Sequence, residues 1–247
     1  MKRMLLILLR NLWRLPWIWI SLCRYAKDPD KYPRETIYAL MRKIAACMIK
    51  GGRIRLEIHG KANLPEENGF ILFPNHQGLF DGFAIVHGME RPFSTVYKTE
   101  LDQVPFVKQV LKSVKALALE RDNPRQGMQV INQVAKEVKE GRNMMIFPEG
   151  TRSRNQNQLL SFKGGSFKTA AKAKCPIVPV ALINAYQVFD SKSIRPITVQ
   201  LYFLAPIPYT AYAKKTTSEI AQTVRTAIAE AIEAHSETPC REGSSLS

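Results

Sequence analysis

The chain has 247 residues, of which 45% are apolar and 23% charged, and it carries a formal charge of +15. This length suits one domain with an appendage, and the composition excludes a disordered or fibrous protein. The basic excess leaves three classes of partner: nucleic acid, an anionic membrane and a phosphorylated substrate. Residues 1–60 hold 13 basic and 4 acidic side chains, whereas residues 61–247 carry a net charge of only +6. Most of the excess charge therefore lies at the N-terminal end.

The first segment, residues 1–23, begins like a signal peptide, with Met-Lys-Arg before an apolar run. Arg10 and Arg14 interrupt that run and no small-residue cleavage site follows, so we predict that the segment is retained. On the insertion scale the two arginines cost roughly 5–7 kcal/mol, which cancels the roughly 3–6 kcal/mol contributed by Leu and Ile. The segment is therefore predicted to lie in the membrane interface as a helix rather than to span the bilayer.

The polar side chains of this helix fall on one narrow stripe when 100° per residue is assumed. The stripe contains Arg3, Arg10, Arg14, Ser21 and Arg24. Trp13, Trp17 and Trp19 are expected at the level of the lipid headgroups. Residues 34–50 form a second predicted amphipathic helix, so residues 1–50 are predicted to anchor the protein to a membrane. The alternative is that both helices only pack on the domain that follows.

Residues 51–236 are predicted to form that domain, and residues 237–247 a disordered tail. Short apolar or alternating runs predict strands over residues 53–59, 70–73, 93–97, 116–119, 143–147, 177–183 and 197–204. Helical periodicity predicts helices over residues 81–87, 104–114, 124–140, 166–174 and 216–235. Strands that alternate with helices indicate an α/β fold, with a mainly parallel sheet flanked by helices.

Two segments of the chain share the same form. Residues 70–76 and 144–152 each run from an apolar strand through Phe-Pro into polar residues. Because Pro cannot continue a central strand, each segment delivers its polar residues at the carboxyl end of its strand. Sites in open α/β sheets are built at that edge. We therefore expect His76 from the first segment and Glu149 to Arg152 from the second to face one crevice.

His76 and Asp81 are candidates for a catalytic pair. A step of five residues on a continuous helix would point them about 140° apart, but Gly78 permits a turn that lets Asp81 reach back to His76. A carboxylate that accepts a hydrogen bond from one imidazole nitrogen leaves the other nitrogen free as a general base. No serine elbow accompanies the pair, so the base must act on a substrate hydroxyl or on water.

Cations are predicted at several strand ends: Lys98, Arg121 and Arg152, the last beside Glu149. Together they suggest a clamp for a phosphate, although a solvated basic rim is the alternative. Gly150 N–H and Asn75 are candidates for stabilising an oxyanion. His59 and His87 look structural. The cysteines lack metal-ligand spacing, which predicts free thiols in a reducing compartment and no metal site.

The motif Asn75-His76-x-x-x-x-Asp81, followed about 70 residues later by Phe147-Pro-Glu-Gly-Thr-Arg-Ser153, resembles the glycerolipid acyltransferases, specifically the 1-acylglycerol-3-phosphate acyltransferases. Residues 117–121, Leu-Ala-Leu-Glu-Arg, resemble a block that ends in Asp-Arg in the family, with Glu in place of Asp. Residues 175–182 resemble the fourth block, an apolar strand with a proline. The resemblance covers residues 50–210.

The resemblance implies that His76 acts as the base on the 2-hydroxyl of lysophosphatidic acid, which attacks an acyl thioester directly, and that Asp81 orients His76. It also implies that Arg121, Arg152 and Lys98 hold the acceptor phosphate, with Glu149 ordering Arg152 or the glycerol. The acyl donor is acyl carrier protein or CoA, and no further cofactor is expected.

These implications place the protein on the cytoplasmic face of the cell membrane as a peripheral enzyme that makes phosphatidic acid. One alternative is a related acyltransferase that uses another lysophospholipid or glycerol phosphate. A second, from a different class, is a non-catalytic module that binds anionic lipid. Nucleic acid is not expected as a partner, because the chain beyond residue 60 has no aromatic-basic binding motif.

Overall fold

A seven-stranded sheet forms the centre of the protein, in the order β1-β7-β6-β2-β5-β3-β4. The computed structural model describes residues 2–120 and 123–236, and the predicted tail lies outside them. The strands are β1 (Ile54–His59), β2 (Ile71–Pro74), β3 (Phe93–Lys98), β4 (Leu117–Leu119), β5 (Asn143–Met145), β6 (Ile177–Ile183) and β7 (Ile197–Phe203). Every neighbouring pair is parallel except β6 and β7. The prediction of a mainly parallel α/β sheet is confirmed.

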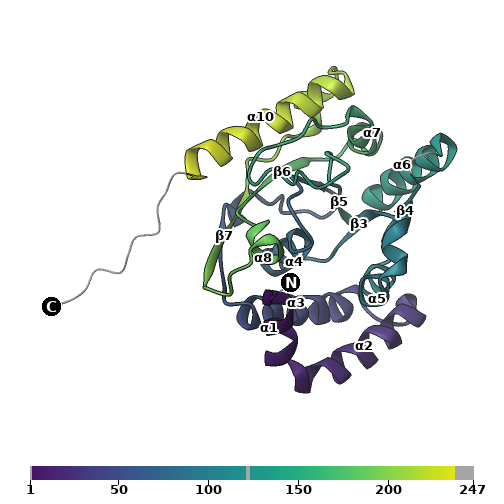
Figure 1. The fold of residues 1–247 in the computed structure, drawn as a ribbon. Coiled ribbons are helices and arrows are strands. Elements are labelled where there is room, and N and C mark those ends of the chain that lie inside the picture. Colours follow the sequence, from purple (N-terminus) through teal and green to yellow (C-terminus); the bar gives the residue numbers. More distant parts are fainter. Residues whose placement is uncertain (1, 121–122, 237–247) are drawn as a thin grey trace.

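Helices cover both faces of the sheet (Figure 1). On one face lie α1 (Lys2–Arg10), α2 (Leu15–Lys27), α3 (Arg34–Gly51), α4 (Asp81–Gly88) and α5 (Pro105–Ser113). On the other lie α6 (Pro124–Lys139), α7 (Gly164–Ala173) and α10 (Thr217–Ser236), while the short α8 (Gln187–Asp190) and α9 (Tyr209–Tyr212) follow β6 and β7. Each face has its own hydrophobic core, and β2 and β6 contribute side chains to both. This double burial explains why these two strands are apolar throughout.

Local sequence signals place the helix ends close to where they were predicted. The side chain of Asn123 caps α6 by accepting from the Gln126 N–H at 3.1 Å, Pro124 is the first helical residue, and Gly141 follows the helix with φ +81°. At α10, the Thr216 N–H donates to the Glu219 carboxylate at 2.7 Å, and the Glu219 N–H donates to the Thr216 hydroxyl at 3.3 Å. These reciprocal bonds form a capping box.

The N-terminal segment is not the single straight helix that the wheel assumed. α1 and α2 meet at 64°, and at the bend the Asn11 amide donates to the carbonyls of Ile7 and Cys47. Within the part of the chain that the structure describes, no single helix is long and apolar enough to cross a membrane, whereas this bent pair reaches that length and composition.

Arg3 corrects the predicted polar stripe. Its side chain is fully buried and donates to three carbonyls: Gly52 O at 2.5 Å, Ser193 O at 3.1 Å and Arg195 O at 2.8 Å. The wheel placed Arg3 with the solvent-facing arginines because it could not see that the α8–β7 loop covers this end of α1. Arg3 therefore fastens α1 to the domain.

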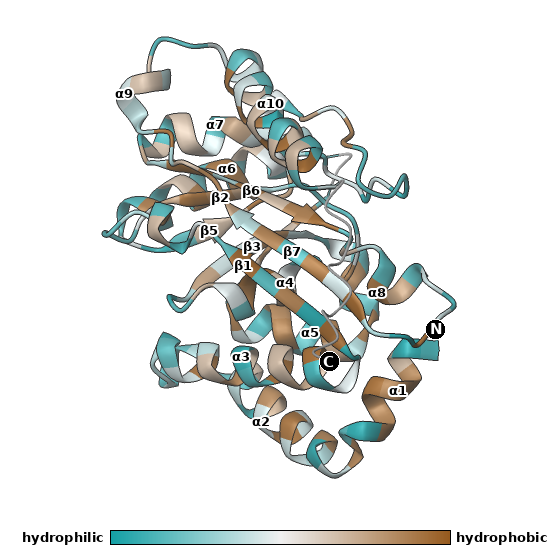
Figure 2. Ribbon diagram, turned by 90° about the vertical axis from the view of Figure 1, so that its left-hand side faces the viewer, coloured by the Kyte–Doolittle hydropathy of each residue, from teal (hydrophilic) through white to brown (hydrophobic). Residues whose placement is uncertain are grey.

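The two predicted amphipathic helices behave differently. α3 buries Ile37, Met41 and Ile44 against α4 and the sheet, so this helix packs closely on the domain. By contrast, α1 and α2 bury only part of their apolar surface. Parts of both helices are coloured as hydrophobic in Figure 2. The exposed large apolar side chains between residues 5 and 20 are Leu5, Leu8, Leu9, Leu12, Trp13, Trp17, Trp19 and Ile20. We call these eight residues the apolar platform.

Candidate active site

The predicted site residues follow strands whose carboxyl ends share one edge of the sheet. β2 lies between β5 and β6, and β5 is paired with β3; all four are parallel. His76 comes two residues after β2, Glu149 lies in the turn after β5, and Lys98 is the last residue of β3. The topology therefore brings these three positions to the same edge, as the two Phe-Pro segments predicted.

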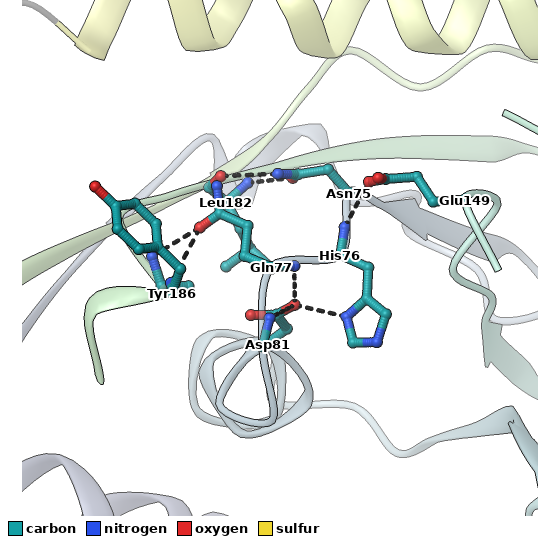
Figure 3. Close-up of polar contacts among 9 residues, drawn as sticks. Asn75, His76, Gln77, Asp81, Glu149, Leu182 and Tyr186 are labelled. Carbon is teal, nitrogen blue, oxygen red and sulfur yellow. Dashed lines mark hydrogen bonds and ion pairs between the residues drawn. The ribbon is translucent and has the colours of Figure 1, made fainter. Parts of the chain in front are cut away.

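His76 and Asp81 form a hydrogen-bonded pair. Asp81 is the first residue of α4, and its Oδ2 lies 2.8 Å from His76 Nδ1 (Figure 3). The same oxygen accepts from the Gln77 N–H at 2.6 Å and the Gly78 N–H at 2.8 Å, which holds the carboxylate in place. Asp81 is fully buried, whereas the His76 side chain is 22% exposed. Because an aspartate only accepts when ionised, Nδ1 carries the proton and Nε2 is free to act as a base.

Two further contacts fix the position of His76. Its ring stacks on that of Phe147, with centroids 4.0 Å apart. Its carbonyl accepts from the Ser153 N–H at 2.9 Å, which ties the loop after β5 to the loop after β2. Asp81 and Phe147 therefore hold the imidazole ring, and the Ser153 N–H holds its backbone. This reduces the conformational entropy that must be lost to reach a reactive geometry.

Glu149 holds the backbone of His76. Its Oε1 accepts from the His76 N–H at 2.8 Å, and its Oε2 accepts from the Leu160 N–H at 3.1 Å. Glu149 is 2% exposed and neither of these bonds involves Arg152, so its role toward Arg152 or the glycerol stays a prediction. Burial raises the pKa of Glu149, and the hydrogen bonds from His76 and Leu160 oppose that rise.

The two candidate oxyanion donors are also already paired. The Asn75 amide donates to Leu182 O at 3.0 Å and accepts from Leu182 N–H at 2.7 Å, so it joins the loop after β2 to β6. The Gly150 N–H donates to Phe147 O at 3.1 Å and closes a turn in which Gly150 has φ +67°. The turn uses the single N–H of Gly150, whereas the Asn75 amide has a second N–H besides the one that donates to Leu182 O. The oxyanion assignment stays a prediction.

The structure describes two of the three predicted phosphate-binding cations. Arg152 is exposed on the loop after β5, next to the Ser153 N–H that bonds to His76. Lys98 is half-buried at the end of β3, opposite Leu119 of β4. Arg121 lies outside the described residues. Arg152 and Lys98 thus stand on the predicted edge, at the rim rather than in the buried network around His76.

A second network, which no sequence pattern predicts, joins the loops after β2, β5 and β6. Gln77 accepts from the Ala185 N–H at 2.8 Å and donates to Asn157 at 2.9 Å, and Asn157 accepts from the Asn184 N–H at 2.8 Å. On the other side, Arg225 of α10 donates to Leu160 O at 3.1 Å. Single polar residues in loops carry no spacing signal, so only their partners reveal them.

The structure shows no hydrogen bond to an aspartate for the other three histidines, all of which lie within the described residues. His59 stacks on Tyr202, whose other neighbour is His235, each at 4.4 Å between centroids. Burial lowers the pKa of His87, which favours its neutral form. Within residues 2–120 and 123–236, no group of three His, Cys, Asp or Glu side chains is placed to hold a metal ion.

The structure thus defines an α/β protein with a hydrogen-bonded His–Asp pair at the carboxyl edge of its sheet. Comparison with known proteins agrees with this class. A family model described as Acyltransferase matches residues 55–183. The chain therefore belongs to the acyltransferase family, as its motifs predicted.

Two curated relatives carry the same description, 1-acyl-sn-glycerol-3-phosphate acyltransferase. The Borreliella burgdorferi protein is 30% identical over 152 residues, which cover 62% of this chain and 60% of that protein. The Salmonella typhimurium protein is 30% identical over 169 residues, which cover 68% and 69%. This chain thus aligns with less than two thirds of the length of the first of these relatives.

A solved structure confirms the fold. The 1-acyl-sn-glycerophosphate acyltransferase from Thermotoga maritima superimposes with a TM-score of 0.79, covering 97% of this chain and 98% of that one, at 20% identity. At this level of identity the likeness shows the fold alone. In this chain, a pair of N-terminal helices precedes the sheet domain.

Proposed function

We propose that this protein transfers a fatty acyl chain from a thioester to the sn-2 hydroxyl of 1-acylglycerol 3-phosphate, giving phosphatidic acid. The observation that carries the proposal is the 2.8 Å contact between His76 Nδ1 and Asp81 Oδ2 at the carboxyl edge of the sheet. Basic side chains at the same edge, Lys98 and Arg152, and the descriptions of the relatives support the acceptor.

The reaction follows from the free nitrogen of His76. Nε2 takes the proton of the acceptor hydroxyl as its oxygen attacks the thioester carbonyl, and Asp81 stabilises the imidazolium that forms. The new C–O bond forms, the C–S bond breaks, and the thiolate leaves with the proton that His76 returns. General-base assistance contributes about 10²–10⁴-fold to such a step. This chemistry uses no metal or cofactor besides the thioester donor, which is the acyl thioester of acyl carrier protein or of CoA.

Phosphate recognition selects the hydroxyl. Arg152 and Lys98 bind the acceptor phosphate at the rim, with Arg121 as a further ligand, and this fixes the distance from the phosphate to His76. Charged hydrogen bonds of this kind are typically worth about 1.5–3 kcal/mol each. An acceptor with the same glycerol but no phosphate lacks these bonds, so its hydroxyl is not held at a fixed distance from His76.

A lysophosphatidic acid with a long chain resides in a bilayer, so the enzyme has to work at a membrane surface. The apolar platform of α1 and α2 supplies that contact: Trp13 is 73% exposed and Leu9 62%. Arg14 lies 4.3 Å from the Trp13 ring and Lys43 lies 5.6 Å from the Trp17 ring, so cations surround the platform. Each cation near an anionic surface adds about 1 kcal/mol. We place the protein on the cytoplasmic face of the cell membrane as a peripheral protein.

The central test is transfer of a labelled acyl chain to 1-acylglycerol 3-phosphate by membranes that contain the protein. His76→Ala is expected to abolish transfer while the protein stays on the membrane, because His76 takes no part in the platform. Undiminished transfer by this variant would show that His76 is not the base.

A second test addresses the membrane. Trp13→Ser, Trp17→Ser and Trp19→Ser together should release the protein from vesicles that contain anionic lipid, while its unfolding temperature changes little, since all three rings are exposed. If the triple variant stays bound as tightly as the wild type, the platform is not the membrane contact.

A further inference from the structure

The basic side chains beyond residue 60 are unevenly distributed. Between Glu149 and Asp190 the sequence holds six basic residues and no acidic one. All six are exposed, and we call them the α7 basic strip: Arg152, Arg154, Lys163, Lys168, Lys172 and Lys174. Their charge of +6 equals the net charge of residues 61–247, so the other charges of that region cancel one another. A concentration of this kind marks a surface for an acidic partner.

The strip begins at the carboxyl edge of the sheet, where Asn75, His76, Asp81 and Glu149 lie. We call this region the catalytic edge. Arg152 and Arg154 flank Ser153, whose N–H bonds to His76 O at 2.9 Å, and the Lys163 N–H donates to Pro148 O at 2.9 Å. From there α7 runs for ten residues, about 15 Å, toward the opposite edge of the sheet. Lys168 and Lys172 are four residues apart and share one face of this helix. The strip therefore leads from the rim of the site along an exposed helix.

A cleft between α6 and α7 extends the positive surface at the far end of the strip. It has a volume of about 390 Å³ and is lined by Asn132, Ala135, Lys136, Lys139, Glu140 and Lys172. Three of its four charged side chains are lysines. The cations thus cover more than one helix and reach well away from His76.

This surface faces away from the apolar platform. In Figure 1, α7 and α10 lie on the face of the sheet opposite to α1, α2 and α3, and Figure 2 shows the same separation from another side. A protein that rests on a bilayer through α1 and α2 therefore presents α7 to the aqueous phase. The partner of the strip has to arrive from water.

We propose that the α7 basic strip is the docking surface for an acidic acyl carrier protein, which presents its thioester to His76 past Arg152 and Arg154. The inference rests on the proposed function, since it names the donor for that reaction. A small anionic acyl donor such as acyl-CoA needs several cationic side chains that converge on its phosphates. Cations spaced along about 15 Å of open helix suit acidic side chains on a protein surface instead.

The experiment compares two donors that carry the same acyl chain, acyl carrier protein and CoA. The variant Lys168→Glu/Lys172→Glu changes the strip without touching Arg152. Lys61→Glu/Lys192→Glu is the matched control, because it makes the same change in net charge at exposed positions outside the strip. For the strip variant we expect the KM for the carrier protein to rise about tenfold or more, a typical size for lost electrostatic steering. Its kinetics with CoA and those of the control should stay at wild-type values.

Salt gives an independent readout. Because exposed charges are screened over about 10 Å at 0.1 M salt, wild-type KM for the carrier protein should rise with ionic strength, and the strip variant should lose that dependence. Equal losses with both donors, an unchanged KM for the carrier protein, a wild type that uses only CoA, or reduced vesicle binding by the strip variant would each overturn the proposal. A wild type that transfers from neither donor refutes the proposed function itself.

Discussion

The catalytic edge and the apolar platform depart from the usual rule of burial in opposite directions. At the edge, Asn75, Asp81 and Glu149 are polar and almost fully buried, with exposed fractions of 1%, 0% and 2%. On the platform, Trp13 and Ile20 are apolar and 73% and 65% exposed. Buried polar groups and clustered exposed apolar groups each reduce the stability of a free protein. Both arrangements therefore point to interactions outside the fold: one with a reacting substrate, the other with a lipid surface.

The two regions also differ in how they are held. Each polar side chain at the edge is tied to a different strand or loop by hydrogen bonds shorter than about 3.2 Å. The platform instead depends on a few anchoring side chains, such as Ile7, Ile18 and Arg3, that attach two short helices to the domain. Substitutions at the edge should therefore change catalysis, whereas substitutions in α1 and α2 should change either folding or membrane binding according to which way the side chain points.

The largest effect is expected for Asp81→Asn. The hydrogen bonds to Asp81 from His76, Gln77 and Gly78 all end on Oδ2. Asparagine can place its oxygen there, where as a neutral group it cannot stabilise an imidazolium, or it can place its NH2 there and present an N–H to His76 Nδ1. That contact favours the wrong tautomer, so kcat should fall about 10²–10⁴-fold. Acyl transfer with saturating acceptor and the unfolding temperature should be measured on the same preparation. A folded variant that keeps more than a third of the activity would separate Asp81 from the mechanism.

Two isoleucines of α2 test the difference between the regions with one kind of substitution. Ile18 is 4% exposed and Ile20 is 65% exposed. Ile18→Ala should lower the free energy of unfolding by about 2–5 kcal/mol, because it leaves a cavity beneath the helix. Ile20→Ala should change stability by less than about 0.5 kcal/mol.

Ile20→Ala should act on the membrane instead. Loss of three carbon atoms at about 0.8 kcal/mol each weakens partitioning into vesicles by about 10–50-fold. Urea unfolding and vesicle sedimentation measure the two quantities separately. The assignment of α2 to a membrane surface fails if Ile20→Ala partitions like the wild type, or if it destabilises the protein as much as Ile18→Ala does.

Glu149→Gln should have an intermediate effect that depends on pH. The amide can accept from only one of the two N–H groups. The free energy of unfolding of the variant should therefore be about 1–3 kcal/mol lower than that of the wild type, whether Glu149 of the wild type is protonated or ionised. Burial raises the pKa of Glu149 in the folded state above its ordinary value of 4.5. A raised pKa stabilises the fold below pH 4.5, and that contribution is lost as the pH rises through the folded-state value.

The free energy of unfolding of the wild type minus that of Glu149→Gln should therefore decrease as the pH increases from 4.5 toward 7. Urea unfolding of both proteins across this range measures the difference, in which the other titrating groups cancel. A difference that stays constant or increases with pH would show that the hydrogen bonds from His76 and Leu160 outweigh burial.

The sequence predicted the edge better than it predicted the platform, for physical reasons. β2 ends at Pro74, and β5 ends at Met145, shortly before Pro148. The residues that follow each strand reach the sheet edge, so His76 and Glu149 could be placed together from the sequence. The exact partner of Glu149 could not, because the Leu160 N–H comes from a loop without periodicity. In α1 and α2 nearly every position is apolar, so sequence could not distinguish buried Ile18 from exposed Ile20. Arg3 was misplaced because its acceptors come from the distant residues 193 and 195.

The smallest expected effect concerns Arg225, which lies on α10 outside the edge yet touches its support. Its Nε donates to Leu160 O, and the N–H of the same residue, Leu160, donates to Glu149, which holds the backbone of His76. Arg225→Gln should remove one half-exposed hydrogen bond worth about 1 kcal/mol. Because the bond acts through Glu149 rather than on substrate, kcat should fall a few-fold while the KM for the acceptor stays unchanged.

Arg225→Lys distinguishes positioning from general stability. A lysine at this site keeps the charge and can still donate to Leu160 O, so it should recover most of the lost kcat. If Arg225→Gln raises the KM instead, Arg225 contacts a substrate. If neither variant changes kcat while both lower the unfolding temperature, α10 supports the fold without supporting His76. The catalytic edge would then end at Glu149, and its order would come from the loops after β2, β5 and β6 alone.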